Sequence, residues 1–281
     1  MKDYFGYEEK TCVITGASSG MGKAAAKLLI ELGADVYVLS RSKPDLDGIR
    51  LWIQTDVGDR ASIDSAFAQL PVNIDRFFGV AGVSGVNNTY EKTFTVDFVA
   101  NKYIAETYLV KRVVNGGAIA FVTSSSGVRW SRPDIVEEYK AIVDADGWDD
   151  TLQAIRDLDQ SENGGSMAYM LAKRAMNYYI ASKAADFSKR DIRINFVMPC
   201  STSTNFVTEF LGTFGGNEQV FLDSIGNGKD FARPEAMAKA IVYINSDLAE
   251  YVSGHGLIVD YGLEAATLCG QRQDMLGMNL L

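Results

Sequence analysis

Short apolar runs alternate with longer segments of helical periodicity along this chain. The runs rich in β-branched and aromatic residues occupy residues 11–15, 36–39, 51–53, 74–80, 118–122, 192–197 and 257–259. After the first run, apolar residues recur at helical spacing, which predicts a helix from about residue 21 to residue 32, ended by Gly33 in a left-handed conformation. Nearly continuous apolar strands separated by helices are typical of a parallel sheet covered on both faces. The pattern therefore predicts one doubly wound α/β domain of about seven strands over residues 1–281.

One segment, at about residues 129–165, breaks this alternation. It is rich in acidic residues and carries a thin apolar stripe that includes Ile135, Tyr139, Ile142 and Trp148. Such a pattern predicts one or two amphipathic helices inserted between a strand and the next core helix. Two roles for this insert remain open, namely a solvated decoration of the domain and a lid over the substrate.

Composition and charge exclude several classes of function. With 47% hydrophobic residues the chain can bury a full core, and its formal charge of −9 argues against a nucleic-acid partner, because phosphate contacts need clustered Lys and Arg. The apolar runs are too short to span a membrane. Three distant cysteines (Cys12, Cys200 and Cys269) and one histidine (His255) predict neither a metal site nor a disulfide framework. Together with the polar, acidic start of the chain, they favour a cytoplasmic location.

The turn after the first apolar run has the composition of a dinucleotide-binding loop. Residues 15–22 read TGASSGMG and lead directly into the first predicted helix. Glycines permit the tight turn and the close approach of backbone to a pyrophosphate, and the helix N-terminus offers free N–H groups to the phosphates. A strand, this loop and an alanine-rich helix in succession predict a nicotinamide dinucleotide cofactor.

The end of the second apolar run indicates which dinucleotide is preferred. An acidic residue there would hold the ribose 2′-hydroxyl of NAD, but this chain has Ser40 followed by Arg41. An arginine can pair with the 2′-phosphate of NADP, and the hydroxyls of Ser18 and Ser40 can add donors. We therefore expect NADP(H), with NAD(H) as the alternative. Asp56, after the third run, can accept a hydrogen bond from the adenine amino group.

Several motifs in order resemble those of the short-chain dehydrogenase/reductase family. The loop at residues 15–22 resembles its TGxxxGxG motif, residues 123–127 (TSSSG) its serine motif, and residues 169–173 (YMLAK) its YxxxK motif. Residues 199–204, and Ser253-Gly254 with Val259-Asp260, resemble the closing segments. The matches run from residue 11 to about residue 262, almost the whole chain.

This resemblance implies an assignment of site residues. The catalytic set is Ser124, Tyr169 and Lys173, with Asp97 in a proton relay, and Ser125 is the alternative to Ser124. The residues expected to bind the cofactor are Gly16, Ser18, Ser19, Gly20, Met21, Gly22, Ser40, Arg41, Asp56, Val57, Ala81, Gly82, Tyr169, Lys173, Pro199, Thr202 and Thr204.

The spacing of the tyrosine and the lysine makes chemical sense. Four residues apart on a helix, Tyr169 and Lys173 share one face. A phenol with a pKa of about 10 is a poor base at neutral pH, and a neighbouring ammonium together with an oxidised nicotinamide would lower that pKa. Tyr169 would then exchange a proton with the substrate oxygen while Ser124 hydrogen-bonds it. The resemblance also implies that Lys173 holds the nicotinamide ribose.

Three positions depart from the family pattern. The NNAG segment reads Gly-Val-Ala-Gly at residues 79–82, and the relay asparagine aligns with Asp97, with Asn101 as the other candidate. Cys200 replaces the glycine that usually follows Pro199. These changes affect the proton relay more than the expected reaction.

The length of the insert resembles that of one subgroup of the family. Ser124 and Tyr169 are 45 residues apart, a layout that resembles a bacterial subgroup typified by 3α-hydroxysteroid dehydrogenase/carbonyl reductase. That likeness implies a bulky apolar substrate such as a steroid, and a homodimer; a homotetramer is the alternative. Residues 203–231 are expected to form a substrate loop over the nicotinamide, or else an ordinary helical hairpin, with aromatic and aliphatic side chains at Phe206, Phe210, Leu211, Phe214 and Phe221.

The sequence as a whole favours an NAD(P)-dependent oxidoreductase that interconverts a secondary alcohol and a ketone, both small-molecule partners. The alternative is a catalytically silent NADP-binding sensor of the same fold. A sugar-nucleotide epimerase fits less well, because this chain has little room for a separate substrate domain.

Overall fold

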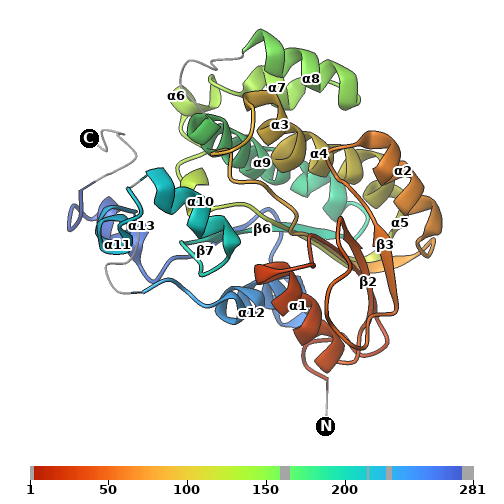
Figure 1. Ribbon diagram of the computed structural model, residues 1–281. Helices are drawn as coiled ribbons and strands as arrows, with labels where there is room; N and C mark the ends of the chain where they lie inside the picture. The colour runs from red at the N-terminus through yellow and green to blue at the C-terminus, as the bar shows by residue number, and fades with distance from the viewer. Residues whose placement is uncertain (1–2, 159–164, 214, 226–229, 274–281) are drawn as a thin grey trace.

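The computed structural model describes residues 3–158, 165–213, 215–225 and 230–273. Within them, seven parallel strands form one sheet in the order β3-β2-β1-β4-β5-β6-β7. The strands are β1 (Thr11–Thr15), β2 (Asp35–Ser40), β3 (Leu51–Gln54), β4 (Ile74–Gly79), β5 (Val113–Val122), β6 (Arg193–Pro199) and β7 (Gly256–Val259). Helices flank the sheet on both sides (Figure 1), and the predicted fold class is confirmed.

The chain between the strands is mostly helical. The α-helices of the described residues are α1 (Gly20–Glu31), α2 (Arg60–Gln69), α3 (Tyr90–Phe94), α4 (Ala100–Ile104), α5 (Val110–Arg112), α6 (Pro133–Val136), α7 (Lys140–Asp144), α8 (Gly147–Asp157), α9 (Gly165–Ser188), α10 (Asn205–Thr213), α11 (Glu218–Ile225), α12 (Pro234–Asn245) and α13 (Leu263–Leu268). The first helix begins one residue before the prediction and ends at Glu31, with Gly33 left-handed at φ +83° as expected.

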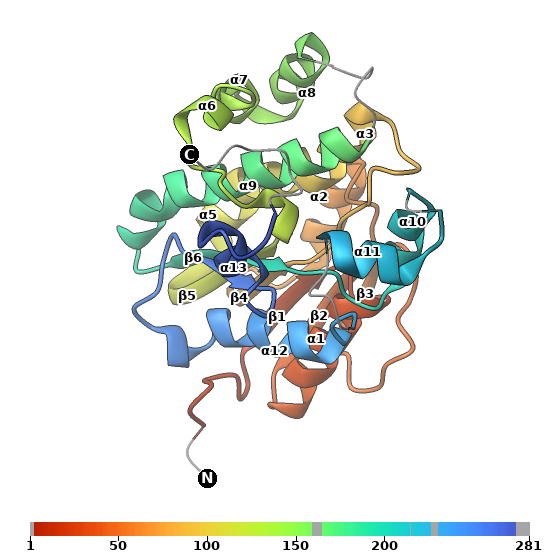
Figure 2. The same ribbon diagram turned by 90° about the vertical axis from the view of Figure 1, so that its left-hand side faces the viewer.

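The strands are apolar throughout because both faces of the sheet are buried. Along β5, Ile119 and Phe121 join the core under α2, α4 and α9, whereas Ala120 and Val122 join the core against α1 and α12. Successive side chains of a strand point to opposite faces, so a strand between two helix layers needs apolar residues at every position. Figure 2 shows α9 on one side of the sheet and α1 and α12 on the other.

The segment from α3 to α5 is one continuous helical stretch containing two π-helical turns, Thr95–Val99 and Ala105–Leu109. π-turns are uncommon and occur often at functional sites. The first of them carries Asp97, which is fully buried beneath the edge of the sheet where the strands end. No pattern of apolar or polar residues predicted these turns.

The described part of the insert forms three helices, α6, α7 and α8, above the α9 layer (Figures 1 and 2). The ring of Trp148 on α8 packs edge-on against Tyr103, with 5.5 Å between the ring centroids. Arg156 on the same helix pairs with Glu91 of α3 at 2.8 Å. The described part of the insert thus covers the outer surface of the helix layer; residues 159–164 lie outside the described residues.

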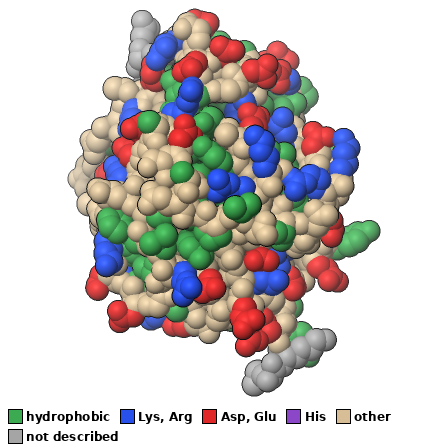
Figure 3. Space-filling view, turned by 90° about the vertical axis from the view of Figure 1, so that its right-hand side faces the viewer, with side chains coloured by type: hydrophobic (Ala, Val, Ile, Leu, Met, Phe, Trp, Pro, Cys, Tyr) green, Lys and Arg blue, Asp and Glu red, His purple; other side chains and the backbone are tan. Residues whose placement is uncertain are grey.

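On the face beside β3 and α2, acidic and basic side chains are mixed and neither sign of charge dominates. Figure 3 shows acidic and basic side chains interspersed there. In the described part of the chain, no helix combines the length and apolarity needed to cross a membrane.

Candidate active site

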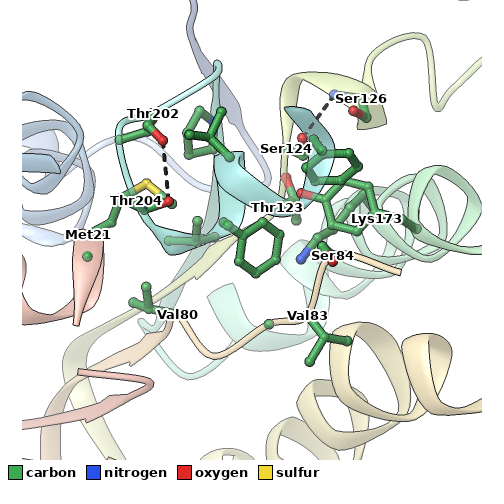
Figure 4. Close-up of a pocket in the computed structure, with 18 of the residues that line it drawn as sticks. Met21, Val80, Val83, Ser84, Thr123, Ser124, Ser126, Lys173, Thr202 and Thr204 are labelled. Atoms are coloured by element: carbon green, nitrogen blue, oxygen red, sulfur yellow. Dashed lines mark hydrogen bonds between the residues drawn. The ribbon is translucent and has the colours of Figure 1, made fainter. Parts of the chain in front are cut away.

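A cleft of about 690 Å³ runs along the carboxyl ends of the strands. Ligands of open α/β sheets bind at this edge, because the loops after parallel strands all emerge there. The cleft extends from the turn before α1 to the ends of β5 and β6 and to α9. Every residue that the sequence assigned to the cofactor lines it, whereas Asp97 lies behind the lining. Figure 4 shows Ser84, Ser124 and Lys173 gathered at one side of this pocket, away from Met21.

The glycine loop has the conformation that its sequence suggested. Gly16 and Gly20 have φ angles of +73° and +55°, which favour glycine. A Cβ on Gly22 would lie 2.3 Å from the carbonyl oxygen of Gly16, so the helix can follow the loop this closely only without a side chain. The N-cap residue, Ser19, makes no side-chain hydrogen bond to the first turn of α1. The first N–H groups of the helix therefore face the cleft without a side-chain cap.

At the end of β2, the two residues predicted to bind the 2′-phosphate differ in the contacts that their side chains already make. The Ser40 hydroxyl donates to the carbonyl of Ser42 at 2.8 Å and accepts from the indole of Trp52 at 3.1 Å. Its hydrogen is therefore already engaged. Arg41 is exposed on the cleft edge and makes no ion pair among the described residues. Asp56, at the end of β3, accepts from the backbone N–H of Gly58 at 2.8 Å through one oxygen.

The predicted catalytic residues converge at the other end of the cleft. Tyr169 and Lys173 come from the same face of α9, and the Lys173 ammonium lies 5.3 Å from the centre of the Tyr169 ring. Ser124, at the end of β5, is hydrogen-bonded to the Tyr169 hydroxyl. The Ser124 oxygen also accepts from the backbone N–H of Ser126 at 3.1 Å, which fixes its position. All three side chains are buried, and Ser124 rather than Ser125 contacts the tyrosine.

Burial raises the pKa of Tyr169 above its usual value, and the Asp97 carboxylate adds to this effect, whereas the hydrogen bond from Ser124 opposes it. The sequence led us to expect a lowered pKa, because it drew attention to the ammonium and gave no measure of desolvation. The groups of the protein alone shift the pKa of Tyr169 in the opposite direction, because moving a phenolate out of water costs more free energy than the hydrogen bond from Ser124 recovers. The neutral phenol is the favoured form near neutral pH.

Asp97 lies beneath the lysine. Its Oδ1 is 3.4 Å from the Lys173 ammonium and accepts from the backbone N–H of Val83 at 3.0 Å, while Oδ2 is buried without a partner. Burial raises the pKa of Asp97, and Lys173 opposes that shift. The alternative residue, Asn101, instead donates to the backbone carbonyl of Asp97. The geometry therefore favours Asp97 over Asn101 as the neighbour of the lysine.

One departure from the NNAG segment has a packing reason. A Cβ at Gly79 would lie 2.3 Å from the ring of Phe121 on the adjacent strand, so this large aromatic residue excludes an asparagine. The backbone N–H groups of Val80 and Ala81 both donate to the Thr15 hydroxyl, at 3.0 and 3.2 Å. Gly82 also needs its small size, because a Cβ would lie 2.9 Å from Asp97 Oδ1. Of the two replaced positions, Gly79 thus has a packing reason, whereas the contacts of Val80 are made by its backbone and do not depend on its side chain.

Two polar pairs in the cleft were missed from the sequence. Arg129 makes a two-point ion pair with Glu264 of α13, with both N–O distances at 3.1 Å. The Ser84 hydroxyl donates to the carboxylate of Glu209 on α10. Each pair joins residues more than 100 positions apart, so no local pattern could have revealed it. None of residues 133–157 of the insert lines the cleft.

The family comparisons divide the chain into two matched segments. The family model described as short chain dehydrogenase matches residues 10–133, and the model described as enoyl-(acyl carrier protein) reductase matches residues 156–264. Most of the insert lies between the two matches.

Curated relatives match over nearly their whole length. A coniferyl-alcohol dehydrogenase of Pseudomonas sp. (strain HR199 / DSM 7063) is 28% identical over 259 residues, covering 90% of this chain and 96% of the relative. A cis-4-hydroxycyclohexanecarboxylate dehydrogenase of Sinomonas cyclohexanicum is 25% identical over 272 residues, covering 92% and 98%.

Solved structures share the fold at lower identity. The 3-alpha-hydroxysteroid dehydrogenase of Pseudomonas sp. B-0831, complexed with NADH, has a TM-score of 0.76 at 20% identity and covers 94% of this chain and 100% of its own. A putative 2-deoxy-D-gluconate 3-dehydrogenase of Agrobacterium tumefaciens with bound NADP has a TM-score of 0.70 at 22% identity, with the same coverage. Neighbours of this fold thus bind either dinucleotide. With its glycine loop, its parallel sheet and family matches over most of its length, the chain belongs to the short-chain dehydrogenase/reductase family of oxidoreductases.

Proposed function

We propose that this protein is an NADP(H)-preferring oxidoreductase that interconverts a secondary alcohol and a ketone, with NAD(H) as the alternative cofactor. One observation carries the proposal: the hydrogen-bonded pair Ser124 and Tyr169, with Lys173 beside it, lies in the same cleft as the glycine loop. One end of the cleft offers proton chemistry and the other offers donors for a pyrophosphate. A dinucleotide bound along the cleft spans both.

The residues at the loop fit such a cofactor. The uncapped N-terminus of α1 suits a pyrophosphate, with Ser18, Ser19 and Met21 alongside. Asp56 and Val57 flank the adenine position, and residues 81–82, 199, 202 and 204 flank the nicotinamide end. The nicotinamide, when bound, supplies or accepts the hydride.

The preference for NADP(H) rests on Arg41. No carboxylate follows β2 where the ribose 2′-hydroxyl would be held, and Arg41 projects at the cleft edge. A guanidinium can form two charge-assisted hydrogen bonds to a phosphate. Because the Ser40 hydroxyl already donates to Ser42, we assign the discrimination to Arg41 alone.

The proton chemistry is assigned to the buried residues. Tyr169 donates its proton to the carbonyl oxygen during reduction and accepts it during oxidation. Ser124 hydrogen-bonds the same oxygen as negative charge develops on it. Lys173 holds the nicotinamide ribose and supplies positive charge near the phenol, and Asp97 fixes the position of that ammonium at 3.4 Å.

The substrate is proposed to be a cyclic or aromatic alcohol or ketone, a hydroxysteroid among the larger examples. The rings of Phe206 and Phe210 on α10 approach Tyr169, with centroids 6.1 and 5.5 Å from its ring. They form an apolar wall beside the reacting atoms. The relatives named for coniferyl alcohol and for cis-4-hydroxycyclohexanecarboxylate, and the steroid dehydrogenase of similar fold, support ring-shaped substrates. We also propose that the protein is a homodimer or a homotetramer and lies in the cytoplasm.

The test follows absorbance at 340 nm with NADPH or NADH across ketones from small aliphatic to aromatic and steroidal. We expect turnover that favours NADPH and cyclic ketones. Turnover of small polar ketones alone would refute the substrate class. Measurable NADPH binding without turnover of any ketone or alcohol would instead support the sensor.

A further inference from the structure

One face of α10 points at the catalytic end of the cleft. Phe206, Glu209 and Phe210 are spaced i, i+3 and i+4, so they share this face, and all three line the cleft. The two phenylalanines approach Tyr169, as described above. A glutamate between two aromatic residues beside a catalytic tyrosine is not explained by packing.

The Glu209 carboxylate reaches across to the loop after β4. Its Oε2 accepts a hydrogen bond from the hydroxyl of Ser84, a residue that is only 1% exposed. The Ser84 oxygen in turn accepts from the backbone N–H of Val86 at 3.3 Å, which orients it. Ser84 and Lys173 line the same side of the cleft (Figure 4). Glu209 therefore lies within the substrate region rather than along the cofactor's path.

Other charges in this part of the cleft are already engaged. Arg129 and Glu264 neutralise each other at two points, and both oxygens of Asp260 accept backbone N–H groups. Arg272 donates to a backbone carbonyl of α11. Among the described residues, Glu209 has no ion-pair partner, and its Oε1 has no hydrogen-bond donor. One acceptor oxygen and a net negative charge thus remain for a ligand.

We propose that Glu209 is a specificity-determining residue that accepts a hydrogen bond from a second, neutral donor group on the substrate, such as a hydroxyl, and rejects substrates with a carboxylate at that position. This inference rests on the proposed function and narrows its substrate class. The substrate is then a cyclic or aromatic alcohol or ketone that carries one further hydroxyl or amino group.

The charge of Glu209 should make the affinity for a ligand depend on the group placed beside it. A hydrogen bond to a charged group contributes more than one between neutral groups, whereas a like charge brought beside Glu209 in a partly dry cleft is repelled. The gain from the hydrogen bond and the loss from the like charge each correspond to a change of about tenfold or more in affinity. A purely structural role, holding α10 against Ser84, would change the affinity for all substrates by the same factor.

The experiment compares three ketones that share one skeleton: acetophenone, 4′-hydroxyacetophenone and 4-acetylbenzoate, together with the corresponding meta isomers of the last two. Their dissociation constants are measured at pH 7 by calorimetry in the presence of NADP⁺, which cannot reduce the ketone during the titration, and kcat/KM is measured for each ketone with NADPH. The proteins are the wild type, Glu209→Gln, Ser84→Ala and, as a matched control on the next helix, Glu218→Gln. Glu218 is exposed and does not line the cleft.

In the wild type, we expect the hydroxyl compound of one isomer series to bind about tenfold more tightly than acetophenone. The carboxylate compound of the same series should bind at least about tenfold more weakly than acetophenone. Glu209→Gln reduces the carboxylate penalty to about threefold or less, because an amide carries no charge. Ser84→Ala and Glu218→Gln retain the penalty. Equal ratios in the wild type and Glu209→Gln would overturn the proposal, as would a wild type that binds the carboxylates as tightly as acetophenone or binds no ketone at all.

These measurements distinguish failure of the Glu209 subsite from failure of the proposed reaction. Turnover of the ketones without discrimination by Glu209 refutes the subsite and leaves the oxidoreductase. Discrimination in binding without turnover of any compound keeps the subsite and refutes the reaction.

Discussion

The two ends of the cleft differ in how they are built. The cofactor end is built mostly of backbone, namely a glycine loop, the first turn of α1 and the ends of three strands, together with the side chains of Arg41 and Asp56. Short contiguous motifs encode all of these parts. The catalytic end consists of side chains from β5, α9, α10 and the π-turn, which only the fold brings together. A backbone site tolerates little variation in geometry, whereas a side-chain site can change its substrate by single replacements. Substitutions at the two ends should therefore affect different measurements.

The largest effect is expected at the catalytic end. Tyr169→Phe removes the hydroxyl that exchanges the proton, so kcat should fall by about 10²- to 10⁴-fold. NADPH affinity, measured by fluorescence titration, should change by no more than about threefold, because backbone at the other end dominates cofactor binding. The matched control is Tyr178→Phe on the same helix, whose ring packs against Trp130 and Tyr139 instead. A similar loss of kcat in both variants would contradict the assignment of Tyr169.

Gly22→Ala tests the cofactor end. A Cβ at Gly22 meets the Gly16 carbonyl at 2.3 Å, so the loop must shift; the free energy of unfolding should fall by about 1–3 kcal/mol and NADPH should bind at least about tenfold more weakly. Thermal unfolding and fluorescence titration measure the two changes. Gly212→Ala is the control, because a Cβ there meets nothing within 4 Å. Unchanged NADPH binding in Gly22→Ala would show that the dinucleotide does not use this loop.

A smaller effect is expected for Arg41→Ala. The loss of a charge-assisted pair to the 2′-phosphate should reduce the ratio of kcat/KM for NADPH to that for NADH by about ten- to a hundredfold, with kcat for NADH little changed. Arg50→Ala, an exposed arginine outside the cleft, should leave that ratio as it is. If the ratio survives in Arg41→Ala, another residue selects the cofactor.

The smallest predicted change is a displacement of the pH profile. Because the pKa of Tyr169 is raised, the phenol keeps its proton at neutral pH, so ketone reduction should be constant there and decline only as alkaline pH removes the proton. The rate of alcohol oxidation should rise with pH over the same alkaline range, which is the alkaline limb of the pH profile. Since the Asp97 charge contributes to the raised pKa, Asp97→Asn should move this limb to lower pH. A limb that stays in place or moves to higher pH would contradict the electrostatic role of Asp97.

The same division explains what could be predicted from the sequence. Seven strands, the first helix and the glycine loop were predicted because periodicity and glycine patterns are local signals. Tyr169 and Lys173 were assigned because residues 169–173 resemble the YxxxK motif of the family, which is also a local pattern. The Ser84–Glu209 and Arg129–Glu264 pairs were missed because they join distant segments. The raised pKa of Tyr169 was missed because burial is a property of the folded protein. Phe214, which was expected to belong to a substrate loop or a helical hairpin, lies outside the described residues.

We propose that the cleft brings a reduced nicotinamide and a ketone together for direct hydride transfer. The most direct test supplies NADPH with deuterium at both C4 positions of the nicotinamide, together with the best ketone of the 340 nm survey, and analyses the product by mass spectrometry. We expect one deuterium in each alcohol molecule formed, and a rate that collapses in Tyr169→Phe. Alcohol without deuterium, or no alcohol while NADPH is bound, would contradict it.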